Sequence, residues 1–204
     1  MYVARSAAYM ADLLLVDRCR EGEELAATEL FRSQKKRVHA TLYRVIGSNR
    51  DMEDLLQETF IQVFRSLHSY RGEAKLSTWI DRIAARVAYK YLSKRKGVPT
   101  PIELVVENES TMPPPLHQVA ARAAIERLYV ALDDLSPTLR VAFALFEIDG
   151  RSMAEVGELV GCTKTTAKLR VWRARRSLLK AAQSDPVLSE LLADVSLGGK
   201  DPSE

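Results

Sequence analysis

The chain has 204 residues, enough for one mid-sized domain or two small ones. Hydrophobic residues make up 47% and charged residues 28%, which is close to the globular average and excludes wholesale disorder, a fibrous repeat and a membrane bundle. The formal net charge is +3, and 9 glycines with 8 prolines are few for an all-β chain, so a helical fold is favoured.

Helical spacing of apolar residues begins near Leu13 and continues almost without interruption to about Lys96. The breaks fall at 47–49 and 70–72, so this part predicts several amphipathic helices packed into a first domain over 13–96. The longest apolar run near the start covers only 13–16, far short of a signal-peptide core or a membrane span. We therefore expect no export and no membrane insertion by the chain itself.

Residues 97–120 form the predicted domain boundary. This segment contains five prolines and little periodicity, which predicts an extended, flexible linker. It carries three Glu and no Lys or Arg, so the linker is acidic.

The second domain is expected over 121–182. Ser136 before Pro137 predicts a helix start, and Ser152 with Glu155 forms a capping-box pattern at the start of a short helix over 152–160. Gly161 then turns the chain, and Thr163 can cap a long basic helix that runs to about Ala182. A short helix, a tight turn and a long basic helix are typical of a helix-turn-helix.

An acidic tail over 183–204 follows the second domain. It carries five acids against one lysine, with three leucines at helical spacing, and either a regulatory segment or a frayed end fits that pattern. The predicted fold is thus all-α, with two helical domains joined by a flexible linker and the second domain ending in a helix-turn-helix.

Charge is strongly segregated despite the small total. Residues 81–96 carry six Lys or Arg against one Asp, and residues 151–182 carry eight against two Glu. Two basic blocks separated by an acidic spacer predict two contacts with one polyanion.

The long basic helix has one apolar stripe at steps of four and three residues, from Ala167 to Ala181. The opposite, exposed face therefore presents Thr165, Leu169, Trp172, Arg173 and Arg176, with Lys168 and Arg170 at its flanks. This face suits a DNA major groove, because arginine can pair with guanine edges while flanking cations meet phosphates. The alternative is a solvated basic helix with no partner.

The helix over 78–96 repeats this arrangement on a smaller scale. Its outward face carries Arg82, Arg86, Tyr89, Lys90 and Ser93, and aromatics among cations suit stacking on unpaired bases. A plain surface helix is an equally good explanation of this pattern.

Catalytic machinery is not evident. Cys19 and Cys162 are far apart and lack zinc-ligand spacing, and the three histidines do not stand at metal-ligand spacing with other donors. We expect no disulfide, metal or cofactor, no enzymatic activity, and a cytoplasmic location.

Two stretches resemble extracytoplasmic function (ECF) sigma factors of bacterial RNA polymerase. The motifs DLLQETF (54–60) and SYRGEAKLSTW (69–79), within 51–96, are similar to sigma region 2, and residues 132–180 are similar to sigma region 4. The resemblance implies core RNA polymerase and promoter DNA as partners, with an anti-sigma factor as a further candidate. It implies a sigma factor that directs the polymerase to promoters and assists promoter melting.

The resemblance also implies roles for individual residues. The implied core polymerase-binding residues are Asp54, Leu55, Gln57 and Glu58. The implied minus-ten DNA-binding residues are Tyr70, Arg71, Arg82, Arg86, Tyr89 and Lys90. The implied minus-thirty-five DNA-binding residues are Thr165, Thr166, Lys168, Leu169, Arg170, Trp172, Arg173 and Arg176, with Arg175 as a further matching cation.

The chain departs from the common family pattern at several positions, among them Arg86, Lys90 and Leu169, so its promoter sequence cannot be taken from relatives. A stand-alone helix-turn-helix regulator is the alternative function. It accounts for residues 121–182 but gives no role to the acidic helix near Asp54 or to the first basic helix.

Overall fold

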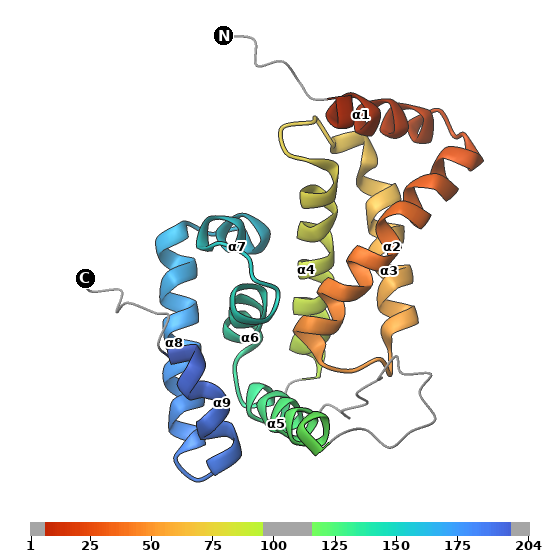
Figure 1. Cartoon of the computed structure of the whole chain (residues 1–204). Helices are drawn as coiled ribbons and strands as arrows, with labels where there is room; N and C mark the ends of the chain where they lie inside the picture. The colour runs from red at the N-terminus through yellow and green to blue at the C-terminus, as the bar shows by residue number, and fades with distance from the viewer. Residues whose placement is uncertain (1–6, 96–115, 197–204) are drawn as a thin grey trace.

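The computed structural model describes residues 7–95 and 116–196, and every element within those ranges is a helix (Figure 1). The all-α prediction is therefore confirmed. The first region, residues 7–95, contains α1 (Ala7–Arg20), α2 (Glu24–Ile46), α3 (Met52–Ser66), the 3-10 turn η1 (Leu67–Ser69) and α4 (Leu76–Lys94). The second region, residues 116–196, contains α5 (Leu116–Asp133), α6 (Pro137–Phe143), the π-helical turn η2 (Ala144–Ile148), α7 (Met153–Val160), α8 (Lys164–Ala182) and α9 (Pro186–Ser196).

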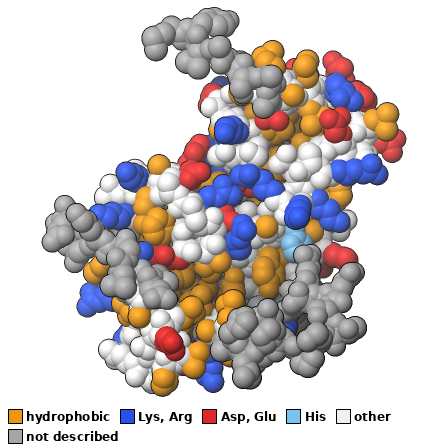
Figure 2. Space-filling model, in the orientation of Figure 1, with side chains coloured by type: hydrophobic (Ala, Val, Ile, Leu, Met, Phe, Trp, Pro, Cys, Tyr) orange, Lys and Arg blue, Asp and Glu red, His pale blue; other side chains and the backbone are white. Residues whose placement is uncertain are grey.

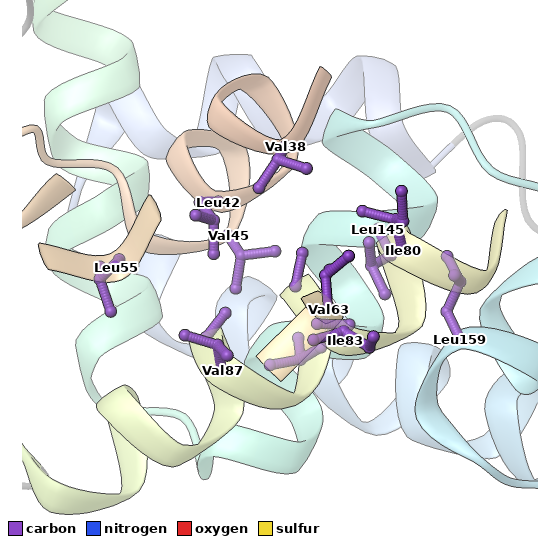
Figure 3. Close-up of a cluster of buried hydrophobic side chains, with 14 of the residues drawn as sticks. Val38, Leu42, Val45, Leu55, Val63, Ile80, Ile83, Val87, Leu145 and Leu159 are labelled. Carbon is purple, nitrogen blue, oxygen red and sulfur yellow. The ribbon is translucent and has the colours of Figure 1, made fainter. Parts of the chain in front are cut away.

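The first region is built from helices that each contribute one apolar face. Figure 3 shows Val38, Leu42 and Val45 of α2 meeting Val63 of α3 and Val87 of α4. All five side chains are 0–3% exposed. Burial of this kind contributes roughly 1.5–3 kcal/mol for each large aliphatic side chain, so the three-helix core holds the exposed faces of α3 and α4 in fixed positions.

The second region differs from the sequence prediction at both ends. Helix α5 begins at Leu116, five residues before the expected start of the domain, and most of the predicted linker, 97–115, lies outside the described residues. Residues 186–196 of the predicted acidic tail form α9, whose Leu188 and Leu192 are each 2% exposed and pack with Leu132 and Leu178. This part of the tail therefore belongs to the folded second region, while 197–204 lies outside the described residues.

Both predicted helix caps in the helix-turn-helix are confirmed. The Ser152 backbone N–H donates to Oε2 of Glu155 at 2.9 Å, and the Glu155 N–H donates to Oγ of Ser152 at 3.3 Å. The Ser152 hydroxyl also donates to Oε2 of Glu155 at 2.7 Å, and this bond together with the one from the Ser152 N–H holds the pKa of Glu155 below its usual value. Thr163 Oγ1 accepts from the Thr166 N–H at 3.2 Å and starts α8. Gly157 lets α7 approach the turn, because a Cβ there would press on the Cys162 carbonyl.

The two regions pack directly on one another. Leu145 of η2 and Leu159 of α7 lie beside Ile80 and Ile83 of α4, so one apolar cluster runs through both regions (Figure 3). Helices α6 and α7 stand between α8 and α4 in Figure 1. We call the contact surface between the first and the second region the seam.

Among the described helices, none combines the length and apolar character needed to cross a membrane.

Candidate nucleic-acid interface

Helix α8 has the two faces that its sequence predicts. Ala167, Val171 and Leu178 are 0–1% exposed and face the rest of the second region. Arg173 and Leu169 lie on the opposite face, which is open to solvent, and 38% of Leu169 is exposed. The exposed face also includes Thr165 and Arg176. A helix held by a dry apolar stripe with cations on its outer face can enter a major groove without deforming.

Three α8 residues that were predicted to bind the minus-thirty-five element have side chains that are less exposed than those of the outer face. Trp172 is half-buried, and the Arg176 guanidinium lies 5.5 Å from its ring centroid, which orients that arginine. Thr166 belongs to the cap of the helix, with its hydroxyl 2.9 Å from that of Thr163. Lys168 is half-buried at the flank.

Two cations of α8 face inward. Arg175 Nε donates to Oε1 of Glu147 at 2.5 Å, and its guanidinium lies over the Phe146 ring, so this residue joins α8 to η2. Arg170 lines a cavity at the seam together with Arg86 of α4. The periodicity of the sequence did not predict these roles. It indicates the direction in which each side chain leaves the helix, but not which neighbouring element covers each flank.

The outer face of α4 carries Arg86, Tyr89 and Lys90, all exposed, with 46% of Tyr89 accessible. Lys90 Nζ lies 3.8 Å from Oε1 of Glu58 on α3. Arg82, one turn earlier, forms an ion pair with Glu158 of α7. The second region thus covers one end of the predicted minus-ten face.

Tyr70 occupies a different environment from the one its predicted role suggests. The side chain is 3% exposed, its hydroxyl donates to the Ala74 carbonyl at 2.8 Å, and its ring centroid lies 5.4 Å from that of Trp79. Burial raises the pKa of Tyr70 to about 12. The ring therefore fixes the loop between η1 and α4, while its neighbour Arg71 is exposed in the same loop.

Helix α3 presents an acidic, solvent-facing surface. Asp54 and Gln57 are exposed and 45% of the Glu58 side chain is accessible, whereas Leu55 is 7% exposed and packs into the core. Asp51 is turned toward α4, where its carboxylate accepts from the Tyr91 hydroxyl at 2.6 Å. Burial and that hydrogen bond raise the pKa of Tyr91 to about 12.

At the seam, Arg140 of α6 is 2% exposed and inserts at the carboxyl end of α2. Its Nε donates to the Val45 carbonyl at 3.0 Å and its Nη2 donates to the Ile46 carbonyl at 2.6 Å. The Tyr129 hydroxyl donates to the Arg44 carbonyl at 2.9 Å. The last carbonyls of a helix lack intrahelical donors, so the second region supplies the C-terminal cap of α2.

A network of ion pairs continues across the seam. Asp81 of α4 is completely buried and accepts from Arg37 of α2 at 2.6 Å and from Arg151 at 3.0 Å. Arg151 also donates to Asp149 at 2.6 Å, and Asp149 pairs with Arg44. Burial alone would lower the pKa of Arg151, but the hydrogen bond to Asp149 and the charges of the two aspartates raise it. Figure 2 shows Lys and Arg side chains gathered where the regions meet.

The roles of these seam residues were not predicted from the sequence. The available signal was Arg140 itself, a lone cation within the apolar run LRVAFAL, since a cation in such a run needs buried acceptors. Among the described residues, no group of three or more His, Cys, Asp or Glu side chains could hold a metal ion.

Two family models match the chain. Residues 30–98 match the model of sigma-70 region 2, and residues 125–178 match the model of sigma-70 region 4, so that together they cover more than half of the chain. The ECF RNA polymerase sigma-E factors of Haemophilus influenzae and Escherichia coli are each 28% identical over 178 residues. These alignments span 83% of this chain and 94% and 93% of the relatives.

Solved structures share the fold. CnrH, in complex with the cytosolic domain of CnrY, aligns with a TM-score of 0.57 at 21% identity over 86% of this chain and 99% of CnrH. The ECF sigma factor SigJ of Mycobacterium tuberculosis aligns with a TM-score of 0.54 at 26% identity over 84% of this chain and 59% of SigJ. RpoE of Bartonella quintana, bound to the anti-sigma factor NepR, aligns with a TM-score of 0.51 at 23% identity, covering 78% and 97% of the two chains.

Proposed function

The chain belongs to the sigma-70 family as an ECF sigma factor, and we propose that α8, α4 and α3 divide the contacts of transcription initiation among them. As a sigma factor it binds core RNA polymerase, directs it to promoters and assists promoter melting. A stand-alone helix-turn-helix regulator is not favoured, because the first region matches sigma region 2 as well.

Helix α8 contacts the minus-thirty-five element. The observation that carries this assignment is the pairing of a completely buried stripe with an outer face of Thr165, Leu169, Arg173 and Arg176. Arg173 stands at the centre of that face and is suited to pair with a guanine, whereas Lys168 at the flank is suited to meet phosphate. Leu169 can cover a thymine methyl group.

Helix α4 and the loop before it contact the minus-ten element. Arg86, Tyr89 and Lys90 supply cations and an exposed ring for unpaired bases, and Arg71 extends the same surface. Tyr70 is assigned here as a positioning residue, because its buried ring and its bond to the Ala74 carbonyl hold the loop that presents Arg71.

Helix α3 docks on the polymerase through Asp54, Gln57 and Glu58. Exposed carboxylates contribute little to folding stability but can fix the orientation of a protein interface. Leu55 acts indirectly, because its burial in the first-region core holds the helix that carries the three polar residues.

Promoter binding also requires the seam to open. Elements centred near positions −35 and −10 are roughly 85 Å apart along B-form DNA at 3.4 Å per base pair. In the structure, α4 and α8 are separated only by α6 and α7 (Figure 1), and Arg82 of the minus-ten face is paired with Glu158. One molecule in this arrangement cannot reach both elements, so the structure corresponds to a closed state.

Three further assignments follow from family membership. The chain acts by binding and leaves catalysis to the polymerase, and it works in the cytoplasm, where that enzyme transcribes. An anti-sigma factor is a candidate regulator, since RpoE of Bartonella quintana was solved with NepR on the same fold.

Size-exclusion chromatography with core RNA polymerase, followed by promoter-dependent transcription, tests the proposed docking face. Reversing charge in the double variant Asp54→Lys with Glu58→Lys should weaken co-elution while helical circular dichroism is preserved. The double variant Glu126→Lys with Asp134→Lys is the matched control, because these two exposed acids lie in the second region, away from α3. Equal co-elution of both variants with core polymerase would reject the α3 assignment.

A further inference from the structure

A cavity of about 200 Å³ lies at the seam, with walls from both regions. Ala85 of α4, Val141 of α6 and Leu159 of α7 provide an apolar floor, and each of these three side chains is at most 2% exposed. An apolar protein cavity of about 150 Å³ is large enough to bind benzene, so this one can hold a single six-membered ring with a small substituent.

The polar groups at this cavity are cationic. Arg86 of α4 and Arg170 of α8 line it from opposite regions, with Tyr89 beside them. Neither guanidinium has a carboxylate partner among the residues that the structure describes. Both arginines therefore leave their donors available to a bound molecule.

These two arginines differ from the other arginines of the seam. Those are paired with carboxylates, and the pairs are Arg37 with Asp81, Arg44 with Asp149, Arg82 with Glu158, Arg140 with Asp133, and Arg151 with both Asp81 and Asp149. The protein thus supplies a carboxylate partner for each of the other seam arginines, but not for Arg86 and Arg170 at the cavity. A bound anion would complete the same pattern there.

We propose that this cavity binds a small aromatic carboxylate, with its ring on the apolar floor and its carboxylate between Arg86 and Arg170. Two guanidiniums on opposite sides of one carboxylate provide charge-assisted hydrogen bonds. The apolar floor favours binding of an aromatic ring over binding of a hydrated inorganic ion. A ligand of about nine non-hydrogen atoms would bind with a Kd on the order of 1 mM, since small ligands have few atoms to contribute affinity.

Such a ligand would also hold the two regions together. Its contacts come from α4 on one side and from α6, α7 and α8 on the other, so it binds the closed state and loses the contacts to one region when the seam opens. This regulatory consequence rests on the proposed sigma function, whereas binding itself does not. The ligand would also occupy Arg86, which is assigned to the minus-ten element.

Calorimetric titration of the full chain with benzoate tests the site, and benzamide serves as the uncharged isostere. Benzoate should bind at least tenfold more tightly than benzamide and should shift the methyl resonances of Ala85 and Val141. Arg170→Gln should weaken benzoate binding about tenfold, because it removes one of two charge-assisted contacts. Absence of benzoate binding, or equal binding of benzamide and benzoate, would overturn the proposal.

Filling the cavity gives an independent check that does not touch the arginines. Ala85→Leu, or Thr138→Leu on α6 should the first variant lose helical circular dichroism, should abolish benzoate binding. Unchanged binding in the folded variant contradicts the site. A transcription assay without ligand separates the two proposals. If the chain binds benzoate but fails to direct initiation, only the sigma roles assigned to its faces are refuted. If the chain directs initiation normally but does not bind benzoate, only the proposed ligand site in the cavity is refuted.

Discussion

Arg151 holds Asp81 across the seam, with its Nη2 3.0 Å from Oδ2 of a carboxylate that is completely buried. Arg151 belongs to the turn before α7, whereas Asp81 belongs to α4, so this ion pair joins the helix-turn-helix to the first region. Breaking a buried pair leaves a charge without its partner, which is costly. The stability of the closed state therefore depends on this contact.

Replacing Arg151 with alanine should lower the free energy of unfolding by about 2 kcal/mol, because Asp81 keeps only Arg37 as a cationic partner. The same change should increase the affinity of the free protein for single-stranded minus-ten DNA, since the closed state pairs Arg82 of that face with Glu158 of the second region. Urea unfolding and fluorescence anisotropy measure the two effects. Arg50→Ala, which removes an exposed arginine outside the seam, is the control and should change neither quantity.

Gly47 is predicted to be irreplaceable for two separable reasons. Its φ of 77° favours glycine, and an added Cβ would overlap the ring of Tyr129. Gly47→Ala should cost about 3 kcal/mol of unfolding free energy, of which about 1 kcal/mol is backbone strain. In a Tyr129→Ala background only the strain remains, so a double-mutant cycle should show strong coupling. An identical cost in both backgrounds would show that the ring is not packed on Gly47.

Alkaline pH should destabilise the protein through its buried tyrosines. Burial raises the pKa of Tyr70 and Tyr91 to about 12 and raises that of Tyr129 as well, so the neutral phenols are favoured in the folded state. This stability is complete below the unfolded-state pKa of about 10 and is lost as the pH rises toward 12 and beyond. Tyrosinate absorbance followed together with circular dichroism should show unfolding in that range; ionisation of nearly all the tyrosines by pH 11 with intact helices would contradict it.

The exposed face of α8 predicts different roles for Arg173 and Lys168. Arg173→Ala should cost about 1–3 kcal/mol on the preferred minus-thirty-five sequence and relax discrimination at one base position. Lys168→Ala should weaken binding to all sequences alike and reduce the salt dependence by about one unit of log–log slope. Binding selection on randomised promoters at two salt concentrations measures both. A uniform loss of affinity in Arg173→Ala would place the base-contacting face elsewhere on the helix.

Periodicity and cap chemistry predicted the helix-turn-helix closely. Ser152 bonds to Glu155 and Thr163 bonds to Thr166, each three residues along the chain, so these hydrogen bonds are determined locally and can be predicted from the sequence. The buried stripe of α8 was equally predictable, because a 3.6-residue repeat identifies the apolar face regardless of what covers it.

The seam could not be predicted in the same way. Arg140 donates to the carbonyls of Ile46 and Val45, which are 94 and 95 residues away along the chain. Every residue has a backbone carbonyl, so the sequence does not indicate which carbonyls accept these hydrogen bonds. The resemblance to sigma region 2 assigned Tyr70 to the minus-ten element, but the sequence does not show that the Tyr70 ring packs against Trp79 or that its hydroxyl bonds to the Ala74 carbonyl. Contacts that depend on how distant helices meet require the three-dimensional structure.

Separation of the two regions on the promoter is the most direct test of the account. Fluorophores at Glu53 on α3 and Ser177 on α8, both exposed, can be introduced as cysteines after Cys19 and Cys162 are replaced by serine. Energy transfer should be high in the free protein and should fall sharply when core RNA polymerase and promoter DNA are added together. Energy transfer that stays high in a complex active in transcription would contradict the account, because both promoter elements would then be engaged by the closed state.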